Sequence, residues 1–113
     1  MVTDSTTQLD ELDTRAFALS DLLAYQDGAI VSRTLIDEAS ATVTAFALDA
    51  GQRISEHSAP HEALLQVVDG TGEVRIDGEA FELSTGEAIM LPANVPHAVD
   101  APSRFKMLLT MVR

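Results

Sequence analysis

The 113-residue sequence contains no cysteine and no tryptophan, and Lys106 is its only lysine. Without cysteine, disulfide bridges, thiolate catalysis and sulfur-ligated metals are all excluded. Any metal ion must therefore be bound by histidine nitrogen or by oxygen. Because tryptophan is absent and Tyr25 is the single tyrosine, aromatic platforms for sugar rings are scarce, which disfavours a polysaccharide substrate.

Long apolar runs and several catalytic motifs are also missing. No run approaches the roughly 20 apolar residues that span a bilayer. The N-terminus, MVTDSTTQLDELDTR, lacks the basic head and apolar core of a secretion signal. We therefore expect a cytoplasmic protein. No serine lies in a G-x-S-x-G elbow, and no glycine-rich stretch opens a helix, so neither serine-nucleophile catalysis nor a phosphate loop is indicated.

Basic residues are few: 18 acidic residues face seven basic ones, which gives a formal net charge of −11. Such a field repels phosphate groups, so we expect neither nucleic acid nor a membrane surface as a partner. An acidic surface almost free of lysine is typical of halophilic proteins, which stay in solution at high ionic strength. An ordinary acidic bacterial protein is the alternative reading of the same composition.

The length and the 46% of apolar residues fit one domain with a single core. The first fifteen residues hold four acidic side chains and few apolar ones. We therefore expect a flexible acidic tail over residues 1–15 and a single β-barrel domain over residues 16–113. Ser20, followed by Asp21, predicts the N-cap of a short helix or turn that ends near Gly28.

A hydrophobic period of two begins after residue 29, which indicates β-strands. Turn sequences separate the apolar runs, among them Asp77-Gly78, which favours a type I′ hairpin turn. The expected strands cover residues 30–36, 42–48, 64–68, 73–76, 80–83, 88–91 and 105–112, with a turn at residues 69–72. Strands at intervals of about 8 to 12 residues predict an all-β barrel or sandwich.

Two stretches then resemble the paired signatures of the cupins. Residues 51–70, GQRISEHSAPHEALLQVVDG, contain His57, and residues 86–97, GEAIMLPANVPH, end at His97. The 15 residues between them match the short spacing of the most compact members. The resemblance covers the chain from about residue 29 onward. It implies a double-stranded β-helix (jelly-roll) barrel, commonly a homodimer, with its site inside the barrel mouth. Exposed sheet edges would also favour a homodimer.

The resemblance carries over only part of a metal site. Metal-binding cupins supply two histidines one residue apart and then a glutamate from the first signature, and a further histidine from the second. In this chain Ala59 and Ala63 occupy two of those positions. Only His57 and His97 match the ligand pattern.

His61 and Glu62 are candidates to replace the missing ligands. On a regular strand His57 and His61 would lie about 13 Å apart, from four steps of about 3.3 Å. Ligands of one metal ion bind it at about 2.0 to 2.1 Å, so the chain must turn between them, and Pro60 permits such a turn. We therefore predict a metal site formed by His57, His61 and His97.

Glu62 and Gln66 form a second tier of candidates. Gln66 lies between Leu65 and Val67, and because side chains alternate along a strand it faces either the barrel interior or the outside. Three imidazoles would suit a divalent metal ion: zinc, iron, nickel or copper, and manganese less well.

Three functions remain open at this point. The first is a metal-dependent enzyme that acts on a small organic molecule, such as an acid, ketone or diketone. The second is a metal-free module that binds a small-molecule ligand, with His57 and His97 as hydrogen-bonding or acid–base groups. The third is a sensor or accessory protein without catalysis. A cluster of Arg53 with the histidines would attract a carboxylate.

Overall fold

The computed structural model describes residues 2–6 and 12–113, in which nearly all regular structure is β-strand. No helix in these ranges is long and apolar enough to cross a bilayer. The elements are β1 (Val2–Thr6), η1 (Leu19–Asp21, a 3-10 helix), β2 (Ile30–Asp37), β3 (Ala41–Leu48), β4 (Arg53–His57), β5 (Glu62–Ile76), β6 (Glu79–Ser84), β7 (Ala88–Leu91), β8 (His97–Asp100) and β9 (Phe105–Val112). The all-β prediction is confirmed.

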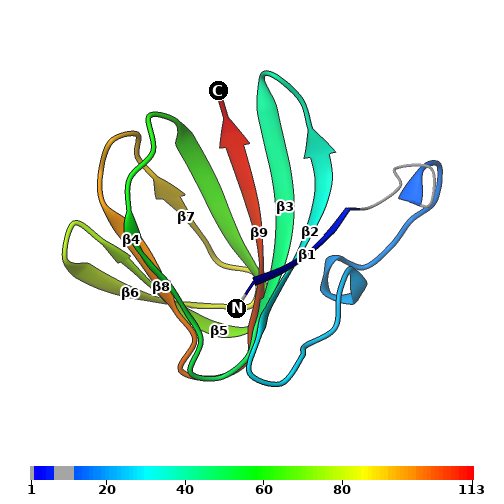
Figure 1. Ribbon diagram of the computed structural model, residues 1–113, viewed down its shortest axis with the longest axis horizontal. Helices are drawn as coiled ribbons and strands as arrows, with labels where there is room; N and C mark the ends of the chain where they lie inside the picture. The colour runs from blue at the N-terminus through cyan, green and yellow to red at the C-terminus, as the bar shows by residue number, and fades with distance from the viewer. Residues whose placement is uncertain (1, 7–11) are drawn as a thin grey trace.

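The strands form two sheets that share β5. Sheet A has the order β1-β2-β3-β9-β5-β7, and sheet B has the order β6-β5-β8-β4. All neighbouring strands are antiparallel except β1 and β2, which are parallel. Figure 1 shows the two sheets meeting along β5 and diverging toward the end of the barrel at which β9 ends. This is the curled jelly-roll arrangement that the cupin resemblance implies.

β5 belongs to both sheets because the strand bends in its middle and remains one continuous strand. The sequence predicts a turn at residues 69–72, and this prediction is wrong. Gly70 has a φ of 76°, and the register of β5 against β9 shifts between Val67 and Asp69. The chain therefore changes direction at a bulge and continues into sheet B. A side chain at Gly72 would place its Cβ 2.5 Å from the ring of Phe105, so the bend requires glycine where it packs against that ring.

The other predicted strands are confirmed to within two residues, and the Asp77-Gly78 turn has the two positive φ angles, 49° and 84°, of type I′. The expected N-cap at Ser20 is wrong, because η1 begins at Leu19 and its N-cap residue is Ala18, which makes no side-chain capping hydrogen bond. Strands β4 and β8 were not predicted. β4 is an edge strand exposed at most positions, so it shows no hydrophobic alternation.

The predicted flexible tail at residues 1–15 falls partly outside the described residues, since residues 1 and 7–11 are not described. Within the tail, Val2–Thr6 forms β1, which pairs with β2 at the edge of sheet A. The sequence does not predict a strand there. The division into a tail and a barrel domain that begins at residue 16 stays a prediction.

Two apolar clusters lie on opposite faces of sheet A. The larger one fills the space between the sheets, where Phe105, Leu48 and Leu65 are fully buried. The smaller one lies on the outer face, where Leu22 of the N-terminal segment packs with Ala45 and Leu108. The N-terminal segment therefore covers the outside of the sheet and leaves the interior to the barrel core.

Candidate functional site

His57 and His97 come together at the edge of sheet B. His57 is the last residue of β4, His97 is the first residue of β8, and the two are direct partners in the antiparallel ladder. Their ring centroids lie 4.5 Å apart with an angle of 67° between the planes. An irregularity in β4 between Ile54 and His57 shifts the register just before the histidine. The fold thus brings together two histidines that are 40 positions apart in the sequence.

Both imidazoles are oriented by the backbone just before them. Nδ1 of His57 lies 2.9 Å from the carbonyl oxygen of Ser55, and Nδ1 of His97 lies 3.2 Å from that of Val95. A carbonyl oxygen only accepts hydrogen bonds, so Nδ1 must carry the proton in each ring. In the neutral form, Nε2 of each ring therefore has a free lone pair that can accept a hydrogen bond or bind a metal ion.

The two rings differ in exposure. His97 is buried, with 9% of the residue's surface exposed, whereas His57 is exposed. Burial lowers the pKa of His97, the proximity of His57 lowers it further, and the hydrogen bond to Val95 partly offsets both. His97 is therefore neutral at pH 7, the state in which Nε2 is available.

The pair borders a cavity of about 190 Å³ between the two sheets. The remaining lining residues are apolar: Phe46, Ile54, Leu65, Leu91, Val99, Met107 and Leu109. An apolar cavity of about 150 Å³ engineered into another protein is large enough to bind benzene. This cavity therefore has room for a molecule about the size of a single ring, and among the described residues the two histidines are its only polar side chains.

Sequence reasoning found the histidines of this site but missed its apolar walls. Leu65 belongs to β5 and Met107 to β9, and both are core positions by their alternation. That alternation identifies them as buried, but it cannot distinguish a wall of a cavity from a tightly packed core. Ile54 lies on β4, a strand too exposed to show a hydrophobic alternation.

His61 and Glu62 are placed differently from the histidine pair. His61 ends the loop after β4 and Glu62 begins β5, and neither of these described residues lines the cavity. Across the described residues, no three histidine, aspartate or glutamate side chains gather closely enough to hold a metal ion. Catalytic zinc sites use three protein ligands, so the two gathered imidazoles do not complete one. The three-histidine site stays a prediction.

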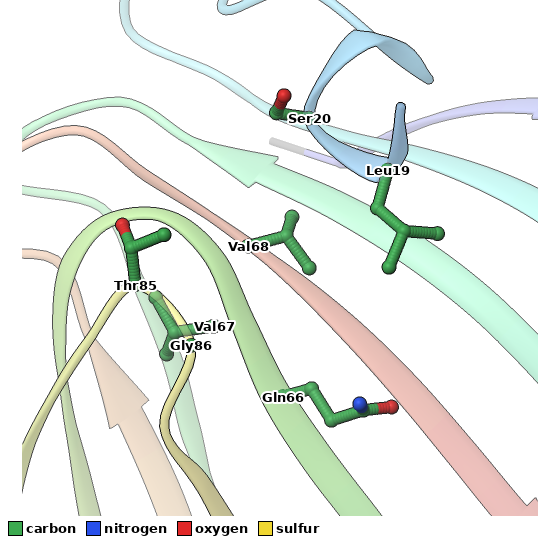
Figure 2. A pocket seen from close by; sticks show the side chains of 7 residues that line it. All are labelled: Leu19, Ser20, Gln66, Val67, Val68, Thr85 and Gly86. Carbon is green, nitrogen blue, oxygen red and sulfur yellow. The ribbon is translucent and has the colours of Figure 1, made fainter. Parts of the chain in front are cut away.

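Gln66 lies on the opposite side of sheet A from the histidines. Its neighbours Leu65 and Val67 are buried in the core, so the alternation of β5 directs Gln66 outward. There it lines a second pocket of about 310 Å³. Figure 2 shows its side chain projecting from β5 on the side where Leu19 of η1 lies, with Thr85 and Gly86 at the other end of the pocket.

The backbone joins the two signature loops beside the site. The amide of Asn94 donates a hydrogen bond to the carbonyl oxygen of Ala59 at 2.7 Å, and Asn94 has a φ of 64°. The residue that stands in place of a metal-binding histidine thus contributes a main-chain acceptor that fixes the loop. A main-chain hydrogen bond thus connects the loop that precedes β5 to the loop that precedes β8.

Arg53 does not contribute a free positive charge to the histidine pair. It stands at the other end of β4 from His57, and its Nε lies 3.2 Å from the carboxylate of Asp100. The cluster of Arg53 with the histidines, which would attract a carboxylate, is therefore absent from the described part of the chain.

Comparisons with known proteins agree with this fold. A conserved protein of unknown function from Streptococcus pyogenes is 34% identical, with a TM-score of 0.85 and 88% of each chain covered. A cupin 2 conserved barrel domain protein from Leptotrichia buccalis is 40% identical, with a TM-score of 0.83 over 86% of this chain and 47% of the other.

A third relative is known from its sequence. The polyketide synthase CurC of Streptomyces cyaneus is 44% identical over 48 residues, which are 42% of this chain. The match spans only 31% of that relative's length. Residues 45–113 of this chain match the family described as Cupin domain. By this match, which covers more than half of its length, the chain belongs to the cupin family.

Proposed function

We propose that this cupin binds a small organic molecule, about one ring in size, in the cavity between its sheets. The observation that carries the proposal is an apolar cavity of about 190 Å³ in which His57 and His97 are the only polar side chains from residues 2–6 and 12–113. Small-molecule sites are typically concave and apolar, with a few polar groups that fix the orientation of the ligand.

The lining residues favour a ligand that has one apolar end and one polar end. Leu65, Leu91 and Val99 would contact an apolar body, while His57 and His97 would hydrogen-bond a polar group at the edge of the cavity. A molecule this small gains little from burial alone, so we expect a dissociation constant between about 10 µM and 1 mM. The partial likeness to a polyketide synthase supports a carbon-rich ligand.

The same pair of imidazoles is suited to proton transfer. A neutral histidine with a free Nε2 can take a proton from a bound molecule, provided that the proton lies within hydrogen-bond reach. Burial keeps His97 neutral near pH 7 by lowering its pKa. Binding is the proposed function, and acid–base catalysis on the bound molecule is the reaction type that these residues would support.

Cavity filling tests the proposal. Protein treated with a chelator is titrated with toluene and with phenol by calorimetry. Replacement of Ile54, a partly buried cavity residue on an edge strand, by phenylalanine (Ile54→Phe) should weaken binding by about tenfold or more, because the added ring occupies the site. The matched control is Val68→Phe, which adds a ring at the outer pocket.

Two outcomes would contradict the proposal. One is an equal loss of binding in Ile54→Phe and Val68→Phe, which would indicate general destabilisation or binding on the outer face. The other is the absence of binding for every ring-sized probe in wild-type protein at millimolar concentration. Circular dichroism of each variant establishes that the barrel is folded before the titrations are compared.

A second candidate function is supported by the hydrogen bonds at Nδ1. Histidines that bind metal ions usually donate their other ring N–H to a carbonyl or carboxylate, as His57 and His97 do here. A metal-dependent cupin would need His61 as a third ligand, with zinc, iron, nickel or copper as the fitting divalent ions. Chemistry at the metal would then act on the small molecule.

Elemental analysis distinguishes this candidate from the first. Purified wild-type protein should contain metal close to one ion per chain, and both His57→Ala and His61→Ala should lose most of it. If wild-type protein contains no metal and takes up none from solutions of these ions, the metal-dependent candidate is wrong. Loss in His57→Ala but not in His61→Ala would exclude the three-histidine site.

A further inference from the structure

We infer that the barrel cavity selects ring-sized ligands that donate hydrogen bonds, such as phenols and catechols, over ligands of the same size that can only accept them. This inference rests on the proposed function, because it names the chemical class of the ligand in the same cavity. It follows from the direction of the hydrogen bonds that the histidines already make and from the chemistry of the remaining wall.

The N–H groups of both imidazole rings already donate hydrogen bonds within the protein. Nδ1 of His57 donates to Ser55 O at 2.9 Å, and Nδ1 of His97 donates to Val95 O at 3.2 Å. Each neutral ring has one donor and one acceptor nitrogen. With both donors used within the protein, the nitrogens left for a ligand are two Nε2 acceptors.

The other described side chains that line the cavity offer no hydrogen-bond donor. The other side chains that line this described cavity are hydrocarbon except for the thioether of Met107, and none of them has an N–H or O–H group. Strands β5, β8 and β9 pair with a neighbour on each side, which engages most of their main-chain amides, whereas the edge strands β4 and β7 pair on one side only. A ligand carbonyl or ether oxygen would therefore find no side-chain donor in the cavity.

Ligand binding would also displace water from the histidines. A ligand that enters the cavity displaces the water that would otherwise donate to Nε2 of the buried His97. A hydroxyl group replaces that hydrogen bond, whereas an ether or a methyl group leaves the acceptor without a partner. The cost of an unpaired buried acceptor makes discrimination by a missing donor larger than a typical net hydrogen bond suggests.

The number of hydroxyl groups on the ligand should also affect its affinity. The two rings lie 4.5 Å apart between centroids and meet edge to face. Each of two hydroxyl groups on neighbouring ring carbons would then have one imidazole acceptor on adjacent side chains available to it. We expect a catechol to bind more tightly than a phenol, with the exposed His57 contributing less than the buried His97.

Anionic ligands are disfavoured by the same arrangement. A carboxylate only accepts hydrogen bonds, and the nearest guanidinium on β4, that of Arg53, is paired with Asp100 at the far end of the strand. The net charge of −11 also repels an anion that approaches the barrel. Neutral hydroxylated rings are therefore the favoured class.

A set of ring-sized probes that differ in their hydrogen-bonding groups tests the inference. Chelator-treated protein at about pH 8, where a histidine side chain is ordinarily neutral, is titrated with toluene, anisole, phenol and catechol. Phenol should bind about tenfold more tightly than anisole, catechol more tightly than phenol, and anisole no better than toluene. Equal affinity for all four would overturn the inference and leave the proposed function standing. Failure of all four to bind would overturn the proposed function itself.

Substitution identifies the residue responsible. In His97→Leu the preference for phenol over anisole should fall severalfold, because only the exposed His57 remains as an acceptor, while toluene still binds because the apolar wall remains. If His97→Leu does not fold, His57→Leu at the exposed position should remove the additional preference for catechol. Ser58→Ala, next to His57 but outside the cavity lining, is the control and should keep the full preference. An undiminished preference for phenol in folded His97→Leu would overturn the inference.

Discussion

At the scale of single residues, the histidine pair shows which parts of a site a sequence reveals. His57 and His97 are predictable because each stands at a fixed distance from the glycines of its signature. The separation of His61 from the pair is not predictable, because it depends on the path of the loop around Pro60, and nothing in the residue types fixes that path. The orientation of Gln66 becomes clear only when its neighbours are known to face the core.

Burial of His97 predicts an acid-sensitive contribution to stability. Because its pKa is lowered in the folded protein, the unfolded chain takes up a proton first as the pH falls below about 6.5. The unfolded state then binds more protons, so the free energy of unfolding decreases with falling pH. This decrease stops once the pH is below the folded-state pKa of His97, where both states are protonated.

Chemical denaturation between about pH 5 and pH 8 measures this effect. Wild-type protein should lose stability on acidification, and folded His97→Leu should lose less over the same interval. Identical pH profiles for the two proteins would contradict the assignment of this titration to His97.

At the scale of elements, the N-terminal segment is attached to the outside of sheet A by a polar cluster around Tyr25. The Tyr25 hydroxyl donates to Asp69 at 2.5 Å, and the ring lies under the Arg104 guanidinium, at 5.3 Å, and the Lys106 ammonium, at 4.9 Å. Lys106 also donates to the carbonyl oxygen of Ser20 at 2.6 Å. Burial and Asp69 both raise the pKa of Tyr25, so the hydroxyl remains protonated as the donor.

Loss of the Tyr25 hydroxyl should loosen this attachment. We expect Tyr25→Phe to reduce the free energy of unfolding by about 1 to 3 kcal/mol, because a hydrogen bond to a charged carboxylate is lost. Tyr25→Leu should cost more, since it also removes the ring that contacts both cations. Denaturant unfolding measures both. Equal stability of wild type and Tyr25→Phe would show that the hydrogen bond contributes nothing net.

The bend in β5 is a second feature at this scale. Its sequence, Asp69-Gly70-Thr71-Gly72, has the residues of a reverse turn, and a local pattern cannot reveal that the chain continues into a second sheet. The distinguishing interaction is non-local, since Phe105 of β9 packs against Gly72. The residue types at positions 69–72 therefore led to the wrong prediction of a turn that separates two strands.

A larger residue at the bend should be costly. We expect Gly72→Ala to destabilise the protein by about 1 to 3 kcal/mol, because its Cβ would overlap the Phe105 ring. In a Phe105→Leu background the additional cost should be smaller, since the ring is gone. A double-mutant cycle by chemical denaturation measures this coupling. Strictly additive effects would mean that the two residues do not interact in this way.

At the scale of the whole molecule, the fold was more predictable than the site. The alternation of residues within β2, β3 and β9 and the spacing of the two signatures are properties of the sequence, so the barrel could be inferred from them. The cavity is a property of how the two sheets pack, and no local pattern encodes it. A homodimer stays a prediction, which analytical ultracentrifugation can test.

The net charge of −11 predicts a strong salt dependence. Raising potassium chloride from about 0.1 to 1 M shortens the Debye length from about 10 to 3 Å and screens repulsion among carboxylates. The melting temperature should therefore rise, and the rise should be smaller in a variant with Glu79→Lys and Glu82→Lys on exposed positions of β6. A flat response in wild-type protein would contradict the halophilic interpretation of the composition.

The most direct measurement of where the ligand binds is a set of intermolecular nuclear Overhauser effects between bound phenol and the protein in solution. Phenol in the barrel should give contacts to the methyl groups of Leu65, Leu91 and Leu109 and to the ring protons of His97. Contacts to Leu19 and Val68, which line the outer pocket, without contacts to the barrel residues would contradict a binding site between the sheets.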